Sequence, residues 1–208
     1  MRIFVTGIST EVGKTIASAI ITEALQADYW KPVQAGDLDY SDSHKVAQLI
    51  SNTKTKIHSN SYALNTPMSP HAAADIDGIQ IDINKIVEPK TENRLVVEGA
   101  GGLLVPLNET DTIFDIIKSN DKVIVVSRHY LGSINHSLLT INALMEKGLD
   151  VGVIFSGDVH PATESIILKK TGVKMLGRIN EENGFDKATI SKYASSFQGN
   201  LEDFLMDG

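Results

Sequence analysis

The fold is decided by the stretch Gly7-Ile8-Ser9-Thr10-Glu11-Val12-Gly13-Lys14-Thr15, which has the glycines, the lysine and the hydroxyl of a phosphate-binding loop. It follows the apolar run Ile3-Phe4-Val5 and leads into residues 14–25, whose apolar positions recur at helical spacing. Glycines let backbone N–H groups turn toward phosphate oxygens, Lys14 can reach the β- and γ-phosphates, and the Thr15 hydroxyl can bind Mg²⁺. The stretch therefore predicts a nucleotide-dependent enzyme or switch.

The loop is a variant of the usual phosphate-binding pattern. The strict pattern G-x-x-x-x-G-K-[ST] requires glycine at position 8, where Ile8 stands, so the first glycine lies one residue early and the loop is one residue longer. A Gly-Lys-Thr turn also arises by chance in unrelated chains. The strand before it and the amphipathic helix after it favour nucleotide binding.

Size and composition indicate one globular domain. The chain has 208 residues, 42% of them hydrophobic and 22% charged, which suffices for one core and is too short for two ordinary domains and a linker. We therefore expect a single domain over residues 1–208. Because the chain has no cysteine, disulfides, cysteine-ligated metals and thiol nucleophiles are excluded, including the nucleophile of a cysteine-dependent glutaminase.

Charge and hydropathy favour a small molecule as the partner. The formal net charge is −7 and Lys and Arg form no run, which weighs against nucleic acid or an anionic membrane. Apolar runs such as residues 123–126 are far shorter than the roughly 20 residues that span a bilayer. The N-terminus enters a strand without a charged leader, so a cytoplasmic location is expected.

Short β-branched runs alternate with longer helical segments. The expected strands are Arg2 to Thr6, Asp28 to Val33, Arg94 to Glu98, Lys122 to Ser127, Val151 to Phe155 and Lys174 to Ile179. The expected helices include Lys14 to Leu25 and Ser133 to Lys147. This alternation predicts an α/β fold with a P-loop NTPase-like, mostly parallel sheet flanked by helices. Residues 52–89 have weaker periodicity and are expected to pass over the active-site face.

The second expected strand delivers a lysine to the carboxyl edge of the sheet, where ligands bind in such folds. In Lys31-Pro32-Val33-Gln34-Ala35-Gly36, the proline and the last glycine indicate a rigid turn that places Lys31 on the γ-phosphate side. A solvated surface lysine is the alternative. Next, Ser41-Asp42 opens a helix through Leu49, in which Asp42 is a helix cap or a group close to a metal.

The third expected strand delivers a carboxylate to the same edge. Glu98 ends an apolar run and is followed by Gly99-Ala100-Gly101-Gly102, where glycines permit close approach of a ligand or simply form a tight turn. A carboxylate in that position needs a cation. Thr15, Asp42 and Glu98 form a suitable set for Mg²⁺, which prefers oxygen ligands and phosphate oxygens.

The fourth expected strand leads to a further anion site. The segment Leu131-Gly132-Ser133-Ile134-Asn135-His136 opens a long helix, whose free N–H groups attract an anion such as a substrate carboxylate. The histidines lack H-x-x-x-H and H-E-x-x-H spacing, and no G-x-S-x-G elbow occurs. Zinc-dependent and serine-dependent hydrolysis are therefore not indicated.

Together these motifs resemble the dethiobiotin synthase family, over most of the chain from Val5 to about Ile179. The resemblance rests on the loop, on Lys31-Pro32-Val33, Ser41-Asp42, Ser69-Pro70-His71 and Glu98–Gly102, and on Leu131–His136. The Lys-Pro-Val turn and the Leu-Gly-x-Ile-Asn-His pattern are far more specific than the loop. The family implies that 7,8-diaminononanoate, CO₂ and ATP react to dethiobiotin, ADP and phosphate, with Mg²⁺ as cofactor.

The same resemblance assigns roles to individual residues. It implies that ATP is bound by Glu11, Val12, Gly13, Lys14, Thr15, Ile16, Asp42, Glu98, Gly99, Ala100 and Gly101, and Mg²⁺ by Thr15, Asp42 and Glu98. Lys31 and Lys14 would be catalytic, with Lys31 beside a carbamate. The substrate would contact Lys31, Ala35, Leu131, Gly132, Ser133, Ile134 and Asn135. Gly132 to Asn135 would bind the substrate carboxylate and come from the other subunit of a homodimer.

The chain departs from the family pattern at several positions. Ser9 stands where Asp is usual, and Ala35 where a Ser or Thr hydroxyl contacts substrate. Ser156-Gly157 replaces an Asn that reads the adenine edge, and Asn180 replaces a proline. These departures concern substrate contact at Ala35 and the choice of nucleotide base.

Other functions within the same broad group remain alternatives. A partition-type switch ATPase usually has an extra lysine early in the loop and often a basic amphipathic tail, whereas no lysine lies between Gly7 and Gly13 and residues 200–208 are acidic. A cobalamin-type amidating synthetase usually carries a cysteine-dependent glutaminase. A catalytically inactive module would be expected to lose Lys14, Thr15 or Glu98, which are all present.

Overall fold

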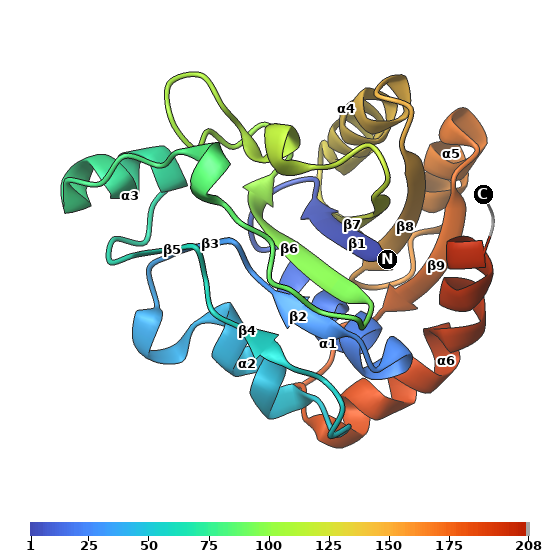
Figure 1. The fold of residues 1–208 in the computed structure, drawn as a ribbon. Coiled ribbons are helices and arrows are strands. Elements are labelled where there is room, and N and C mark those ends of the chain that lie inside the picture. Colours follow the sequence, from blue (N-terminus) through green and yellow to red (C-terminus); the bar gives the residue numbers. More distant parts are fainter. Residues whose placement is uncertain (207–208) are drawn as a thin grey trace.

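A parallel sheet forms the centre of the molecule in the computed structural model, which describes residues 1–206 (Figure 1). Its strand order is β4-β2-β6-β1-β7-β8-β9, and every neighbouring pair is parallel. The strands are β1 (Arg2–Gly7), β2 (Asp28–Trp30), β4 (Ile57–His58), β6 (Leu95–Gly102), β7 (Lys122–Arg128), β8 (Asp150–Ser156) and β9 (Lys174–Ile179). The predicted P-loop-type, mostly parallel sheet is confirmed.

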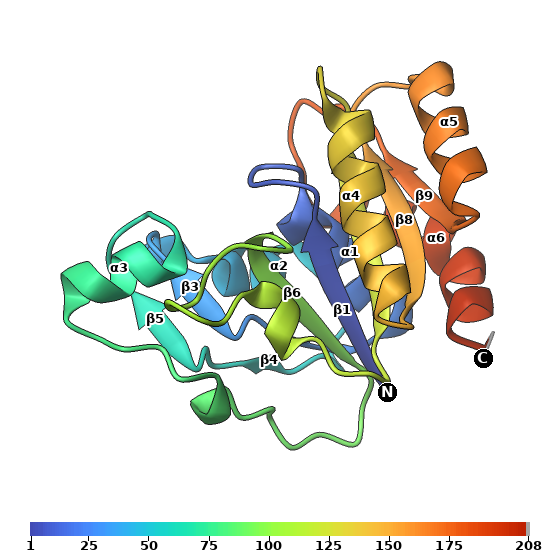
Figure 2. The ribbon, with the colours of Figure 1, turned by 90° about the horizontal axis from the view of Figure 1, so that it is seen from above.

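Helices cover both faces of this sheet (Figures 1 and 2). One face carries α1 (Lys14–Leu25), α2 (Asp42–Leu49) and α6 (Lys187–Met206), and the other carries α4 (Ser133–Glu146) and α5 (Pro161–Thr171). Because both faces are covered, the central strands are almost continuously apolar, as in residues 3–5 and 123–126, which are fully buried. The core therefore lies on both sides of β1 and β7.

A small second sheet lies beyond the β2 side of the main sheet. It pairs β3 (Val33–Ala35) with β5 (Tyr62–Leu64) in parallel, and α3 (Pro70–Asp77) packs against both strands. Short 3₁₀ helices complete the fold: η1 (Leu38–Tyr40), η2 (Ile83–Lys85) and η3 (Ile113–Ile116). Residues 52–89, expected as an irregular excursion, thus contain β4, β5, α3 and η2.

The single strand expected from Asp28 to Val33 is wrong. The chain leaves the main sheet after Trp30 and starts β3 at Val33. Proline lacks an N–H for a ladder hydrogen bond, and the Pro32 carbonyl accepts from Ser61 and Tyr62 backbone N–H groups instead. The break at Lys31-Pro32 allows Lys31 to leave the sheet edge and enter the site described below.

The strand expected from Arg94 to Glu98 is longer than the sequence indicated. It continues as β6 through the glycines to Gly102, which pairs with Gly7 after a register shift beside Val5. A Cβ atom at Gly99 would lie 3.2 Å from the Phe4 ring and 3.1 Å from Ile113. The glycine run therefore lets β6 pass close beside β1 rather than ending the strand.

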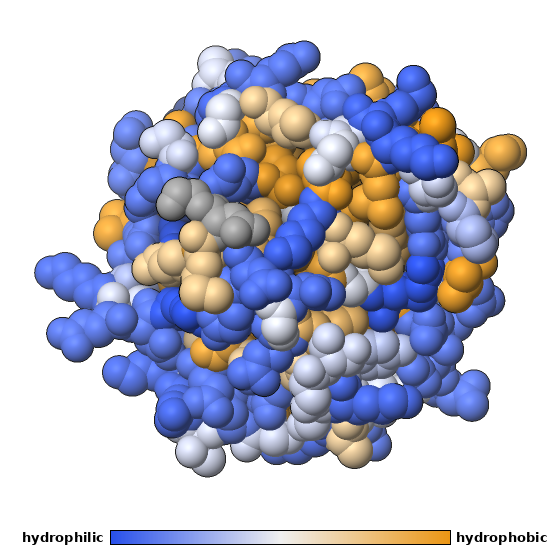
Figure 3. Space-filling model, turned by 90° about the vertical axis from the view of Figure 1, so that its right-hand side faces the viewer, coloured by the Kyte–Doolittle hydropathy of each residue, from blue (hydrophilic) through white to orange (hydrophobic). Residues whose placement is uncertain are grey.

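The side of the molecule with α5, β9 and α6 is largely hydrophilic. Figure 3 shows apolar side chains gathered in the upper half of this side, with hydrophilic side chains around them. β9 is the last strand of the sheet there. Within residues 1–206, no helix has the length and apolar character needed to cross a bilayer.

Candidate active site

The phosphate-binding loop joins β1 to α1 at the carboxyl edge of the sheet. Gly13 has a φ of 93° directly before Lys14, the first residue of α1. A Cβ atom at Gly7 would lie 2.6 Å from a Val12 methyl and 2.8 Å from the Ser9 carbonyl oxygen. The loop therefore needs glycine at position 7, where the first glycine of this longer loop stands.

Lys14 lies folded over this loop. Its Nζ donates to the Ser9 carbonyl oxygen at 3.0 Å, and the residue is 7% exposed. Burial lowers the pKa of Lys14 to about 8; the charge of Glu98 opposes this shift and the charge of Lys31 adds to it. The lysine is thus charged at neutral pH but close to losing its proton.

We expect ATP affinity to fall as pH rises above about 8. Below that pH Lys14 is charged in both the free and the bound protein, whereas above it binding of the phosphates must also take up a proton. The affinity then falls by up to tenfold per pH unit. Measuring the Kd of a non-hydrolysable ATP analogue from pH 6.5 to 9.5 checks this. The guanidinium of Lys14→Arg stays charged over this range. If the Kd of that variant rose at the same pH, the pH dependence would not come from Lys14.

Glu98 lies at the centre of the polar network. Its side chain is fully buried at the point where β6 passes the loop. Oε1 accepts from the Thr15 hydroxyl at 2.9 Å and from Lys31 Nζ at 3.0 Å, while Oε2 accepts from the Tyr29 hydroxyl at 2.9 Å. Each oxygen therefore has a partner, as a buried carboxylate requires.

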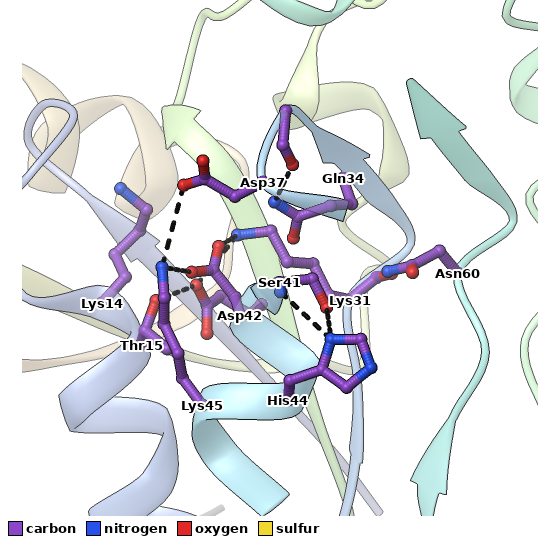
Figure 4. A network of polar contacts seen from close by, with 12 residues as sticks. Lys14, Thr15, Lys31, Gln34, Asp37, Ser41, Asp42, His44, Lys45 and Asn60 are labelled. Atoms are coloured by element: carbon purple, nitrogen blue, oxygen red, sulfur yellow. Dashed lines mark hydrogen bonds and ion pairs between the residues drawn. The ribbon is translucent and has the colours of Figure 1, made fainter. Parts of the chain in front are cut away.

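Lys31 bridges Glu98 and Asp42. Figure 4 shows Lys31 beside Asp42. Burial alone would lower the pKa of Lys31, but the charges and hydrogen bonds of the two carboxylates outweigh it and raise the pKa above its usual value. Burial likewise opposes ionisation of Asp42, and the charge of Lys31 prevails and lowers that pKa. Lys31 is 5% exposed, so the surface-lysine alternative is wrong.

Asp42 is the first residue of α2 and not its cap. The N-cap is Ser41, which forms a capping box with His44. Asp42 is therefore free to pair with Lys31, and its second oxygen lies 3.4 Å from Lys45 Nζ. The prediction that Asp42 caps the helix is therefore wrong, and its place close to a metal stays a prediction.

A cavity of about 730 Å³ opens over these residues. Predicted site residues in its lining are Glu11, Gly13, Lys14, Thr15, Ile16, Lys31, Ala35, Asp42, Glu98, Ala100 and Gly101. Two other predicted residues pack behind it: Val12 lies under Gly7, and Gly99 lies against Phe4 and Ile113. The structure thus brings the lysines, the carboxylates and the loop together in one cavity.

The segment Leu131–Asn135 does not line this cavity within the described chain. Gly132, with a φ of 102°, precedes α4, and Leu131 is fully exposed. The predicted substrate contacts at Leu131–Asn135 would therefore need a second subunit.

Sequence reasoning missed several residues of the cavity. Thr10, Gln34, Asp37, Lys45, Pro67, Met68, Ser69, Pro70 and Val105 also line it. Ser69-Pro70 was noted only as part of the family pattern. Tyr29 was also missed, because an aromatic residue in a strand looks like ordinary core. Its partner Glu98 is 69 residues away, and no local signal joins the two.

The Tyr29 hydroxyl fixes the orientation of the Glu98 carboxylate. Burial and the neighbouring Glu98 charge raise the pKa of Tyr29 well above its usual value, so the hydroxyl remains a donor to Oε2. With Glu98 as the predicted Mg²⁺ ligand, we expect Tyr29→Phe to need about tenfold more Mg²⁺ for half-maximal turnover, the usual scale for groups that orient a metal ligand. A Mg²⁺ titration of activity checks this, with Tyr40→Phe, an exposed tyrosine, as control. Equal Mg²⁺ requirements in wild type and Tyr29→Phe would contradict it.

The oxygen groups of this site fit Mg²⁺. The Thr15 hydroxyl hydrogen-bonds Glu98 directly, and the Asp42 carboxylate reaches the same lysine as Glu98. Among residues 1–206 no group of three or more His, Asp or Glu could hold a metal by itself. A site with two carboxylates and a hydroxyl suits an ion whose remaining ligands are phosphate oxygens and water.

A second hollow lies at the other end of the strands. It measures about 870 Å³ and includes Asp28 and Lys56 in its lining. The buried Asp28 carboxylate is fully used, since it accepts from the Lys56 backbone, Thr91 and Asn93 and contacts His58. This hollow is not lined by the phosphate-binding loop, so the cavity over Lys31 is the candidate site.

The parallel sheet and the loop between β1 and α1 define a P-loop nucleotide-binding protein, and a family model described as an AAA domain matches residues 1–189. The chain is 60% identical to the ATP-dependent dethiobiotin synthetase of Christiangramia forsetii, over 95% of this chain and 96% of that protein. It is 48% identical to the ATP-dependent dethiobiotin synthetase of Cytophaga hutchinsonii, over 93% of this chain and 95% of that protein. The chain therefore belongs to the ATP-dependent dethiobiotin synthetase family, and the resemblance seen in its motifs is confirmed.

Solved structures with the same fold are more distant. A protein described as a plasmid partition protein from Borrelia burgdorferi, bound to AMPPNP, has a TM-score of 0.63 at 15% identity, covering 98% of this chain and 97% of that one. The MinC:MinD cell division protein complex of Aquifex aeolicus has a TM-score of 0.57 at 16% identity, covering 100% of this chain and 96% of that one. At such identities the likeness shows the fold alone. The partition-type alternative is not favoured over the synthetase family.

Proposed function

We propose that the protein is a dethiobiotin synthase, which uses ATP and Mg²⁺ to convert 7,8-diaminononanoate and CO₂ into dethiobiotin, ADP and phosphate. The observation that carries the proposal is the 60% identity to a dethiobiotin synthetase along nearly the whole of both chains. The cavity supports it, because two buried lysines and two carboxylates lie beside the phosphate-binding loop. The proposal also places the protein in the cytoplasm, where ATP is available as co-substrate.

The proposed reaction has three steps, each of which asks something of these residues. One substrate amine adds to CO₂ and loses a proton, giving a carbamate. A carbamate oxygen then attacks the γ-phosphorus and ADP leaves, giving a carbamic-phosphoric anhydride. The neighbouring amine attacks the carbonyl carbon, phosphate leaves, a proton is lost, and the ureido ring closes. Positioning and charge neutralisation carry most of such catalysis.

The residues of the cavity divide these tasks. The loop residues Glu11–Ile16 would hold the phosphates with Lys14, and Lys31 would neutralise the carbamate. Mg²⁺, held by Thr15, Asp42 and Glu98, would supply positive charge at the phosphate oxygens. Backbone groups of Gly99–Gly101 run along the same edge and, in the proposal, contact the nucleotide.

The proposal includes a homodimer with the substrate site at the subunit interface. The Leu131–Asn135 segment of one subunit would bind the substrate carboxylate in the cavity of the other. Exposed apolar side chains on and before α4 support this, namely Leu131, Ile134, Leu139 and Met145. Sedimentation equilibrium tests it, and a monomer with full activity would rule out the shared site.

The test of function is incubation with Mg-ATP, bicarbonate and 7,8-diaminononanoate, followed by phosphate assay and product mass. Phosphate release that depends on the diamine, together with dethiobiotin, is the expected result. ATP hydrolysis indifferent to the diamine, without a new product, would overturn the proposal and favour a switch acting through protein partners.

We further expect weak discrimination among nucleoside triphosphates. Ser156, at the end of β8, lies beside the loop, since a Cβ atom at Gly13 would approach its hydroxyl to 3.1 Å. A serine lacks the amide that could pair with both a donor and an acceptor of the base. Turnover with CTP or GTP is therefore expected within about tenfold of that with ATP. Ser156→Asn should increase the preference for ATP; a strong ATP preference in wild type would contradict the expectation.

A further inference from the structure

Lys31 occupies the acidic pair that would hold Mg²⁺. Its Nζ contacts Glu98 Oε1 at 3.0 Å and also donates to Asp42 Oδ2. The side chains of Glu98 and Lys31 are 0% and 6% exposed, so this ion pair is shielded from solvent. The ammonium is therefore the counter-ion of both carboxylates in the structure.

A divalent metal competes with this lysine for the same atoms. Mg²⁺ binds oxygen at about 2.0–2.1 Å, and Glu98 Oε1 already accepts from Thr15 and Lys31. Two cations on one buried oxygen repel each other strongly where water screens little. Mg²⁺ and the Lys31 ammonium therefore cannot share Glu98 in the observed arrangement.

We propose that Lys31 and Mg²⁺ are alternate occupants of the Glu98–Asp42 pair, so that metal binding releases Lys31 into the cavity. This inference rests on the proposed function only in taking Mg²⁺ as the metal. The flexible four-carbon stem of lysine permits the movement without a backbone change. The released ammonium is then available to an anion in the cavity.

Gln34 offers the released lysine an acceptor. Its Nε2 donates to the Gly36 carbonyl oxygen at 3.0 Å, which fixes the amide and leaves Oε1 as the buried atom without a partner. Gln34 lines the same cavity as Lys31 and lies beside it in Figure 4. A buried acceptor without a partner costs free energy, so an ammonium that turns toward it gains a hydrogen bond. Gln34 thus becomes a positioning residue for Lys31.

Exchange of the two cations would couple metal loading to catalysis. Without metal, Lys31 neutralises the carboxylates and keeps the buried site folded. With metal, the same ammonium becomes free for the carbamate. The Lys31 ammonium therefore becomes available to the substrate only when Mg²⁺ occupies the Glu98–Asp42 pair.

The first test measures thermal stability without nucleotide or diamine, in EDTA and in millimolar Mg²⁺. Lys31→Met should melt about 8 °C below wild type in EDTA, because the buried Glu98 loses its counter-ion and Asp42 keeps only Lys45, at 3.4 Å. Mg²⁺ should restore more than half of this loss, and it should stabilise wild type and Lys31→Arg less than Lys31→Met, because in those proteins the metal must first displace the cationic side chain. An equal Mg²⁺ response in wild type and Lys31→Met would overturn the proposal, and so would an unchanged melting temperature in EDTA.

The second test uses wild-type protein and holds even where Lys31→Met fails to fold. Brief acetylation with acetic anhydride, read by peptide mass spectrometry, reports how available the Lys31 amine is. Mg²⁺ should raise labelling of Lys31 at least threefold and leave the exposed Lys54 unchanged. In Gln34→Leu this rise should become larger, because the acceptor is gone. Labelling of Lys31 that Mg²⁺ leaves unchanged would overturn the exchange.

These outcomes are independent of dethiobiotin formation. Loss of the synthase proposal would appear in the wild-type assay with diamine, whereas loss of the exchange would appear in the two nucleotide-free experiments. Each result therefore bears on one of the two ideas.

Discussion

Lys31→Ala should lose about 10³-fold in kcat for dethiobiotin formation while its Kd for ATP changes less than about threefold. Both lysines line the cavity; in the proposed function Lys31 would face the carbamate, and Lys14, which would hold the phosphates, is untouched. Removing Lys31 therefore removes charge stabilisation in the reaction and leaves most of the nucleotide contacts. Ring closure followed by product mass, and equilibrium binding of a non-hydrolysable ATP analogue, measure the two quantities.

Lys45→Ala is the matched control for this experiment. Lys45 also contacts Asp42, at 3.4 Å, but its side chain is about one-third exposed and screened by solvent. We expect less than about a threefold change in kcat for this variant. Near wild-type turnover in Lys31→Ala would mean that Lys31 only balances the charge of the carboxylates. A parallel loss of ATP binding would place it with the phosphate contacts instead.

The sheet could be predicted because its causes are local. Apolar runs such as residues 3–5 and 123–126 are buried on both faces, and helix-spaced segments lie between them. The predicted start and end of α1 agree with the structure. The break at Lys31-Pro32 was missed because Tyr29 and Val33 both read as strand residues. Only the pairing of β3 with the distant β5 shows that they belong to different sheets.

The site could be predicted in part. Lys31 and Glu98 were expected at one edge because carboxyl ends of parallel strands meet there, and Asp42 was grouped with Glu98 and Thr15 as oxygen ligands. The structure brings Lys31 into contact with both carboxylates. The partners that hold them could not be predicted in this way. Tyr29 meets Glu98 across the sheet, and Gln34 faces the cavity from a strand that sequence periodicity did not separate. Such contacts depend on three-dimensional packing between segments far apart in sequence.

The role predicted for the Leu131–Asn135 segment depends on a second subunit. Its glycine and the following helix were recognised, and α4 starts at Ser133 as expected. The segment nevertheless lies outside the cavity of its own chain, so its predicted role depends on an assembly that a single chain cannot test.

Glu98→Gln should lower turnover by at least about 10³-fold and destabilise the fold by about 3 kcal/mol. The substitution keeps the shape of the side chain but removes its charge. Thr15 can still donate to the amide oxygen, and Lys31 keeps Asp42 as its one anionic partner. In the proposed function the metal would also lose a buried ligand. Activity at saturating Mg²⁺ and denaturant unfolding measure the two effects.

Comparison with Tyr29→Phe separates the two roles of Glu98. Tyr29→Phe removes one hydrogen bond from Oε2 and keeps the charge, so excess Mg²⁺ should restore most of its turnover. Glu98→Gln should remain inactive at any Mg²⁺ concentration, because the missing negative charge cannot be supplied by more metal. If high Mg²⁺ rescued Glu98→Gln, the carboxylate would be a support for Lys31 rather than a metal ligand, and Asp42 and the phosphates would have to hold the ion.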